Sequence, residues 1–291
     1  MALDVQDDAL VSAKPIAGAP FGWEVDVDLT GTLSPAQREA LARIYRRDGL
    51  ILFRKQSLGR EQQLEACDIF GPALRSELDN YVVSNVEVDG FLGTQELLFH
   101  NDIPYVPAPF LGGSLYALDA EPGAAPTRFA SGFRAWEQLP DELKTRIAGL
   151  KALQVRGRLL GRRTQLDDME AGDTAAAHPV VRRQEGGERP YLFVNADMSA
   201  CITTLSRAES DALLEALFAH LYDQANIYEH HWTVGDLVVW DNLAVQHARS
   251  ETGSAARTLR RVSIGDYGYW EQIPTDLATH TALREMAKAR G

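Results

Sequence analysis

The sequence predicts a mainly β protein, folded as one β-sandwich or barrel with a few helices at its periphery. Short apolar runs typical of strands recur along the whole chain, whereas only a few longer segments carry apolar residues at helical spacing. No internal repeat or low-complexity linker divides the 291 residues. Although this length allows one large or two small domains, we expect a single domain over residues 1–291.

The amino-terminal half begins with a helix and a buried strand. Ser34 and Pro35 are typical of an N-cap and a first helical residue, and Gly49 ends the helix. The apolar run at 50–53 follows directly and predicts a buried strand. The same half is predicted to contain a helix at 60–70, strands at 81–83, 97–99 and 114–118, and a helix at 131–149 that Pro140 interrupts.

The carboxy-terminal half opens with a segment of a different kind. Residues 157–178 mix arginines, acids, glycine and alanine without a sustained period, which predicts a long surface loop or lid. Ser206 with Glu209 forms a capping box for a helix that reaches about residue 224. Strands are predicted at 179–182, 191–195, 226–232, 237–240 and 257–264.

The segment 276–290 carries Leu277, Leu283 and Met286 at helical spacing. This pattern predicts a carboxy-terminal helix that packs either on the core or on a second subunit. A homo-oligomer is therefore an open expectation.

Composition and charge disfavour several classes of partner. The chain has 29 Lys and Arg against 41 Asp and Glu, a formal net charge of −12, which disfavours a surface that neutralises phosphates. No run approaches the ~18 apolar residues that a membrane span needs. We therefore expect no nucleic acid and no membrane as partners. Residues 1–14 contain no apolar run, so we expect neither a secretory signal nor a transit peptide. We therefore expect a cytoplasmic protein.

Histidine is rare enough in this chain to narrow the search for a metal or acid–base site. Among the seven histidines, only His100 is followed two positions later by an acid, Asp102. About one such match is expected by chance in a chain of this composition, so the context of the motif must decide its meaning.

The context offers the geometry of a metal site with two histidines and one carboxylate. An extended backbone places His100 and Asp102 on the same side, because side chains alternate along a strand. His247 follows a strand and a turn at 237–242 and is able to supply the second histidine. Ten residues later, Arg257 opens another strand, where its planar guanidinium is suited to an acidic co-substrate. The alternative is a polar cluster without a metal.

Over residues 25–266 the chain resembles the taurine dioxygenase and 2,4-dichlorophenoxyacetate dioxygenase (TauD/TfdA) family of Fe(II)/2-oxoglutarate-dependent oxygenases. The segments that carry the resemblance occur in the family's order, at 99–102, 123–129, 178–182, 191–195, 232–242 and 257–261, together with His247. The resemblance implies a double-stranded β-helix, the cupin-like jelly roll, which agrees with the many short predicted strands.

The resemblance also implies the cofactors and their ligands. His100, Asp102 and His247 would bind Fe(II), and Arg257 with the hydroxyl of Thr127 would bind 2-oxoglutarate, the co-substrate consumed together with O₂. Such enzymes release succinate and CO₂ and usually hydroxylate their substrate. Because the carboxylate of Asp102 is present, halogenation is disfavoured, since related halogenases replace this carboxylate by a small residue.

The resemblance suggests residues for the substrate as well. Arg261 matches a position that contacts the substrate's anionic group in taurine dioxygenase, and the alternative is a structural ion pair. Tyr81, Asn80 and Asn101 are further candidate substrate contacts. The residues that follow the metal motif, 103–105, are Ile, Pro and Tyr, and this apolar run indicates a bulkier and less polar substrate than taurine.

The sequence therefore predicts an Fe(II)- and 2-oxoglutarate-dependent dioxygenase that hydroxylates a small to medium organic acid. One alternative is a tailoring oxygenase of secondary metabolism that desaturates or epoxidises a larger hydrophobic carboxylate. A second alternative is a non-catalytic jelly-roll binding protein. A packing or surface role is expected for His230 and His231, and a loop or core position for His178. Trp232 and Trp240 are expected to pack in the core beside the site.

Overall fold

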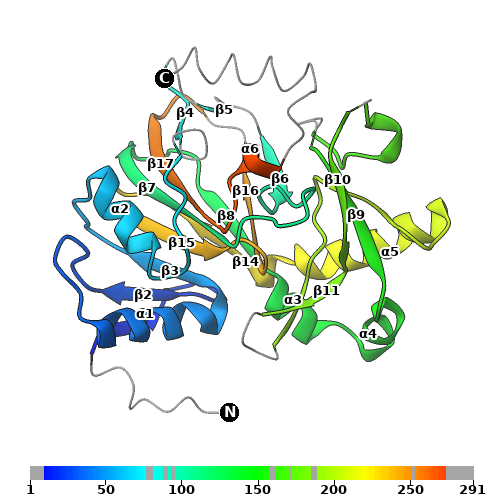
Figure 1. Cartoon of the computed structure of the whole chain (residues 1–291), viewed down its shortest axis with the longest axis horizontal. Coiled ribbons are helices and arrows are strands. Elements are labelled where there is room, and N and C mark those ends of the chain that lie inside the picture. Colours follow the sequence, from blue (N-terminus) through cyan, green and yellow to red (C-terminus); the bar gives the residue numbers. More distant parts are fainter. Residues whose placement is uncertain are drawn as a thin grey trace.

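The computed structural model describes residues 10–76, 81–87, 91–92, 96–157, 161–170, 172–184, 189–250 and 253–272. Its centre is a pair of β-sheets whose inner faces pack together, with helices on the outside (Figure 1). The larger sheet has eight strands in the order β1-β2-β3-β15-β7-β17-β4-β5. The smaller sheet has four strands in the order β14-β8-β16-β6.

The strands of the larger sheet are β1 (Ser12–Pro15), β2 (Trp23–Asp26), β3 (Leu50–Phe53), β4 (Val82–Ser84), β5 (Phe91–Leu92), β7 (Gly112–Ala120), β15 (Leu237–Asp241) and β17 (Arg257–Ile264). Those of the smaller sheet are β6 (Leu97–His100), β8 (Thr127–Ser131), β14 (Ile227–His230) and β16 (Val245–Arg249). Two minor sheets contain β9 (Lys151–Val155), β10 (Ala175–Pro179) and β13 (Ser199–Ile202), and β11 (Val181–Arg183) with β12 (Pro190–Leu192).

The helices are α1 (Pro35–Asp48), α2 (Arg60–Cys67), α3 (Gly132–Gln138), α4 (Asp141–Ile147), α5 (Arg207–Leu221) and the short α6 (Tyr269–Gln272). Two 3₁₀ turns, η2 (Leu166–Asp168) and η3 (Gln224–Asn226), complete the described elements. In Figure 1, α1 and α2 lie beside the larger sheet, while α3, α4 and α5 lie with β9 to β11 at the other side of the molecule.

An apolar core fills the space between the two main sheets. Leu52, Val238 and Leu259 belong to it from the larger sheet, and Phe129 and Val245 from the smaller one. Neighbouring residues of the larger sheet belong to a second core with α1 and α2, because side chains alternate along each strand. These neighbours are Ile51, Val239 and Val262. Since both faces are covered, β3 and β15 are apolar almost throughout.

Local signals for the helix ends are confirmed. The hydroxyl of Ser34 accepts a hydrogen bond from the amide of Gln37, and Ser206 does the same with Glu209, so both α1 and α5 begin with a capping box. Gly49 ends α1 with φ of 70°, a left-handed conformation that favours glycine. The predicted interruption at Pro140 is also confirmed, because it separates α3 from α4.

The structure differs from the sequence prediction in residues 157–178. Residues 175–178 belong to β10, which pairs antiparallel with β9, and η2 lies in the middle of the segment. The strand forms through hydrogen bonds to a partner about 20 residues away, which local composition does not reveal. The described part of this segment is therefore only partly a loop.

Two further expectations concern helices. The predicted helix at 276–290 lies outside them. Among the helices that the structure describes, none combines the length and the apolar character needed to cross a membrane.

Gly132 offers a test of how tightly β8, α3 and the strands around them are joined. A Cβ at this position would lie 2.6 Å from the carbonyl oxygen of Leu192 and 2.9 Å from that of Ala244. Because both contacts are to backbone, Gly132→Ala is expected to destabilise the fold by about 1–3 kcal/mol in denaturant unfolding. Gly31→Ala is the matched control, since a Cβ there meets only one atom, at 4.0 Å. Equal stability of the two variants would contradict this packing.

Candidate active site

The pairing of β16 with β6 places His247 directly opposite His100. Their ring centroids are 4.2 Å apart. Asp102 follows the end of β6, and its Oδ1 lies 3.9 Å from the Nε2 of each histidine. One ligand atom from each of the three residues lies within 4.8 Å of the others, and no other such cluster of His, Cys, Asp and Glu occurs among the described residues.

Both imidazoles are prepared to bind a metal ion. The Nδ1 of His100 donates to the carbonyl oxygen of Leu98 at 2.7 Å, which leaves Nε2 with its lone pair toward the cluster. Burial, together with the neighbouring His100, lowers the pKa of His247 to about 3, so its imidazole is neutral at physiological pH. Neutral imidazole is the form that coordinates metals. Two histidines and one carboxylate are a donor set typical of non-haem iron(II) sites.

Arg261 holds the carboxylate of Asp102 from the opposite side. Its Nη2 lies 2.7 Å from Oδ2 of Asp102, and its Nη1 donates to the hydroxyl of Tyr81 at 2.7 Å. Burial alone would raise the pKa of Asp102, but the charge and hydrogen bond of Arg261, together with the two histidines, outweigh it, and the pKa lies below its usual range. The carboxylate is thus ionised, with Oδ1 toward the histidines and Oδ2 toward Arg261.

Asn242 fixes the turn that carries Asp102. Its Oδ1 accepts from the amide of Asp102 at 2.7 Å, and its Nδ2 donates to the carbonyl oxygens of Asp102 and Phe110. Asn101 donates to the carbonyl oxygen of Asn242 at 2.6 Å and is 1% exposed. These contacts give Asn101 a structural role, and its predicted contact with substrate stays a prediction.

A second buried cation, Arg257, lies on the same face of β17 as Arg261. It is 3% exposed, and its Nη1 donates to the carbonyl oxygen of Ala125 at 2.7 Å. No described carboxylate lies within ion-pair distance of it. Burial and the charge of Arg249 lower the pKa of Arg257 to about 9, which still leaves it protonated at neutral pH. An anionic ligand would offset the cost of burying a cation in this state.

Thr127, the other predicted ligand of 2-oxoglutarate, is also buried, at the start of β8. Its hydroxyl oxygen accepts a hydrogen bond of 3.0 Å from the indole nitrogen of Trp232. The sequence did not predict this contact, because the two residues are 105 positions apart.

Apolar side chains line the region next to Asp102. Tyr105 and Val106 form a buried cluster against Ile103, Met198 and Tyr269. The backbone of Ile103 has φ of 45°, a left-handed conformation that is costly for a β-branched residue. Ile103 directly follows Asp102, the candidate metal ligand, and its conformation turns the chain away from β6.

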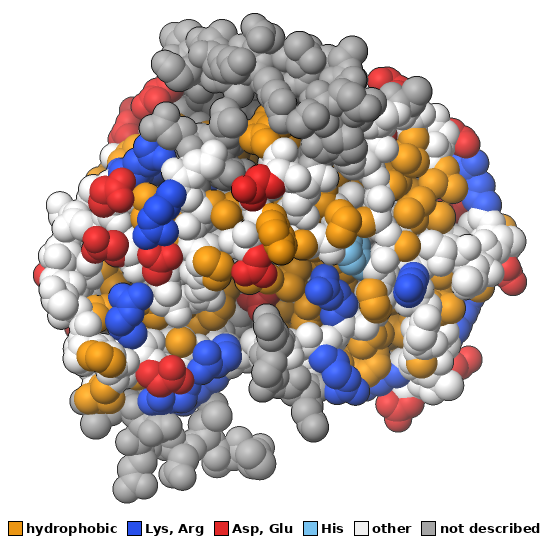
Figure 2. Space-filling view, in the orientation of Figure 1, with side chains coloured by type: hydrophobic (Ala, Val, Ile, Leu, Met, Phe, Trp, Pro, Cys, Tyr) orange, Lys and Arg blue, Asp and Glu red, His pale blue; other side chains and the backbone are white. Residues whose placement is uncertain are grey.

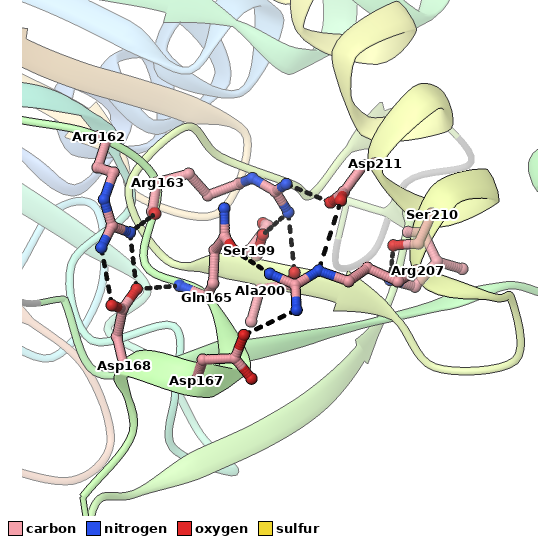
Figure 3. Close-up of polar contacts among 11 residues, drawn as sticks. Arg162, Arg163, Gln165, Asp167, Asp168, Ser199, Ala200, Arg207, Ser210 and Asp211 are labelled. Carbon is pink, nitrogen blue, oxygen red and sulfur yellow. Dashed lines mark hydrogen bonds and ion pairs between the residues drawn. The ribbon is translucent and has the colours of Figure 1, made fainter.

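Two ion pairs fasten the middle of residues 157–178 to α5: Arg163 with Asp211, and Arg207 with Asp167 (Figure 3). A third pair, Arg162 with Asp168, lies within the segment. The side chain of Arg163, 11% exposed, also donates to the carbonyl oxygens of Ser199 and Ala200. The amide of Thr164 donates to the carbonyl oxygen of Asp197 at 2.7 Å. The segment is therefore attached to the rim of β13.

The remaining predicted residues are accounted for as follows. Tyr81 contacts Arg261 near the cluster, whereas Asn80 lies outside the described residues. Arg260, the neighbour of Arg261, points to the opposite face of β17 and donates to Gln63 at 2.7 Å. Sequence reasoning missed the roles of Asn242 and Trp232, for which only their place in the segment 232–242 was a signal.

Comparisons with known proteins show the family to which this chain belongs. The model of the family described as "Taurine catabolism dioxygenase TauD, TfdA family" matches residues 12–263. The 2,4-dichlorophenoxyacetate dioxygenase of Cupriavidus pinatubonensis is 28% identical, covering 88% of this chain and 98% of that protein. The pentalenolactone F synthase of Streptomyces arenae is 29% identical, covering 64% of this chain and 69% of that protein.

Among solved structures, AAD-2 in complex with Mn(II) and N-oxalylglycine is similar, with a TM-score of 0.74 and 24% identity. The match covers 88% of this chain and 97% of that one. This likeness shows the fold, and the predicted jelly roll is confirmed.

The chain belongs to the TauD/TfdA family, whose match covers most of its length. It is a 2-oxoglutarate-dependent dioxygenase, and its cofactors are Fe(II), 2-oxoglutarate and O₂.

The turn that contains Asn242 begins at Asp241, whose carboxyl group makes the stability of the fold depend on pH. Burial raises the pKa of Asp241 to about 6, while its Oδ1 accepts from the amides of Leu243 and Ala244. Because this pKa is above the unfolded value, the ionised carboxyl destabilises the fold as the pH rises from about 4 through 6.

Asp241→Asn keeps both accepted hydrogen bonds and removes the charge. Its stability relative to the unsubstituted protein is expected to increase between pH 4 and 7 by on the order of 2–3 kcal/mol and then to level off. Denaturant unfolding at a series of pH values measures this difference. A difference that does not change with pH would contradict the assignment.

Proposed function

We propose that His100, Asp102 and His247 hold Fe(II), and that Arg257 and Thr127 bind the distal carboxylate of 2-oxoglutarate. The observation that carries the proposal is the pairing of His247 with His100 beside an ionised Asp102, in a protein that also buries Arg257. With these bound, Fe(II), 2-oxoglutarate and O₂ supply the oxidation of an unactivated C–H bond, with release of succinate and CO₂.

The surroundings of Arg257 support its role toward a dicarboxylate. Its guanidinium is fixed by the carbonyl oxygen of Ala125, two residues before Thr127. An incoming carboxylate would offset the burial of this cation and accept the hydrogen of the Thr127 hydroxyl. Both residues lie on strands whose inner faces line the core between the two sheets.

We propose a small to medium organic acid, with an apolar body, as the substrate. Arg261 uses two of its five donors on Asp102 and Tyr81, and its remaining donors are available to anchor a carboxylate, with Asn80 as a further candidate contact. Ile103, Tyr105 and Met198 offer an apolar wall for the rest of the molecule. The similar dioxygenase of Cupriavidus pinatubonensis is named for an aromatic acid, 2,4-dichlorophenoxyacetate. Hydroxylation is the reaction proposed for such a substrate.

A larger hydrophobic carboxylate is the second candidate. It is favoured by the extent of the apolar cluster, which continues to Val106 and Tyr269, and by the similarity to a pentalenolactone F synthase. Residues 157–178, attached to β13 through Arg163, would form the wall that limits its size. Desaturation or epoxidation is the reaction proposed for such a substrate.

Wider properties remain proposals from the sequence. We propose one domain, a cytoplasmic location, and no nucleic acid or membrane partner, with a homo-oligomer left open. On the face shown in Figure 2, the Lys and Arg side chains of the described residues are scattered among Asp, Glu and hydrophobic side chains. This distribution supports the expectation that no nucleic acid binds at that face.

An anaerobic titration with Fe(II) and 2-oxoglutarate, followed by visible absorption, tests the proposed ligands. The unsubstituted protein is expected to develop a weak band that His247→Ala abolishes. Arg257→Ala is expected to lower the affinity for 2-oxoglutarate by at least about tenfold, because it removes a charge-assisted contact. Arg260→Lys, on the opposite face of the same strand, is the matched control and should leave the band unchanged.

The absence of a band in the folded, unsubstituted protein would overturn the proposal and favour a non-catalytic binding protein. If the band forms, O₂ uptake with aryl and alkyl carboxylates, compared with the matching sulfonates, distinguishes the substrate classes. Faster uptake with sulfonates would contradict a carboxylate as the anionic group of the substrate.

A further inference from the structure

We propose that Trp232 is a positioning residue for 2-oxoglutarate, because its indole N–H fixes the direction in which the hydroxyl of Thr127 donates. This inference rests on the proposed function, since it deepens the role given to Thr127 there. The observation behind it is the hydrogen bond of 3.0 Å from Nε1 of Trp232 to Oγ1 of Thr127.

The chemistry of the two groups determines the direction of this bond. An indole nitrogen is only a donor, so the oxygen of Thr127 must accept. A hydroxyl has one hydrogen, which is then free to be donated to another acceptor. Thr127 and Trp232 are 3% and 7% exposed, so solvent competes little for either group. When a carboxylate is bound nearby, the hydroxyl of Thr127 is therefore already oriented to donate its hydrogen to it.

A buried network holds the indole in place. The ring of His230 packs edge-on against Trp232 with centroids 4.4 Å apart. His230 is fully buried, and its Nδ1 lies 2.7 Å from the hydroxyl of Tyr228. Its Nε2 lies 3.3 Å from Oδ2 of Asp236, which Arg54 pairs with at 2.6 Å. These contacts connect the indole to an arginine that reaches the surface.

The sheet itself sets the spacing of this arrangement. His230 of β14 is the register partner of Thr127 in β8, so Trp232 follows two residues beyond the paired position. The amide of Thr233 donates to Asp236 at 3.0 Å and closes the turn behind the indole. Trp232 is thus attached on both sides, by the strand before it and by the turn after it.

Binding of 2-oxoglutarate to the Mn(II)-loaded protein, measured by anaerobic calorimetry, tests the proposal without turnover. Trp232→Phe keeps an aromatic ring and removes the N–H. It is expected to lower the affinity for 2-oxoglutarate roughly threefold to tenfold, because one hydrogen bond to the ligand is no longer directed. Binding of 2-oxobutanoate, which lacks the distal carboxylate, should not change. His231→Gln, at the exposed neighbouring position, is the control and should leave both ligands unaffected.

A second substitution guards against a folding defect. Replacing Trp232 by benzothienylalanine exchanges the N–H for sulfur in a ring of nearly the same shape, and the same loss is expected. Thr127→Val removes the hydroxyl itself. In a protein that already carries Thr127→Val, Trp232→Phe should cause no further loss, because the hydroxyl through which the indole acts is gone.

The outcomes separate this inference from the function on which it rests. Equal losses for 2-oxoglutarate and 2-oxobutanoate, or additive losses with Thr127→Val, would overturn the positioning role and leave Trp232 as a packing residue. A normal affinity in the benzothienylalanine protein would do the same. If Thr127→Val and Arg257→Ala both leave 2-oxoglutarate binding unchanged, the proposed function itself fails.

Discussion

The antiparallel pairing of β16 with β6 is the constraint on which the rest of the site depends. It places His247 opposite His100, and the turn after β6 then brings Asp102 within 3.9 Å of both imidazoles. Neither strand could shift by one residue without sending its histidine to the outer face of the sheet. The metal donors are therefore positioned by main-chain register, with Asn242 holding the turn that follows.

The distribution of buried charge supports the proposal that the site takes an anionic co-substrate. On β17, alternation directs Arg257 and Arg261 inward and Arg260 outward toward α2. Arg261 is neutralised by Asp102, whereas Arg257 has no carboxylate within ion-pair distance among the described residues. Burying a cation is costly, so its presence indicates a ligand that brings the missing negative charge. The same strand thus carries one arginine that pairs with Asp102 and one that we propose receives the co-substrate.

Local signals predicted much of the fold. The capping residues Ser34 and Ser206, the break at Pro140 and the apolar runs of β3 and β15 depend on neighbours in sequence, so these elements were predicted near their observed ends. The strands β8 and β16 were missed, as were β1, β2, β9 and β13. The sequences of β8 and β16, TRFAS and VQHAR, place polar side chains among apolar ones, so neither forms a recognisable apolar run. These strands are defined by pairing with partners distant in sequence.

Contacts between distant segments explain the remaining differences. The hydrogen bond of Asn101 to Asn242 was not predicted, because the two residues lie 141 positions apart. The hydrogen bond from Trp232 to Thr127 was equally invisible in the sequence. By contrast, the His-x-Asp motif, His247 and both inward arginines were predicted, because residue type, spacing and the family resemblance act together there.

The most direct test is a pair of crystal structures, one free of metal and one soaked with Mn(II) under anaerobic conditions. If register alone builds the site, the ion is bound by His100, Asp102 and His247, and these side chains move by less than about 0.5 Å between the two structures. An ion bound elsewhere, or a metal-bound form in which His247 no longer faces His100, would contradict this description of the site.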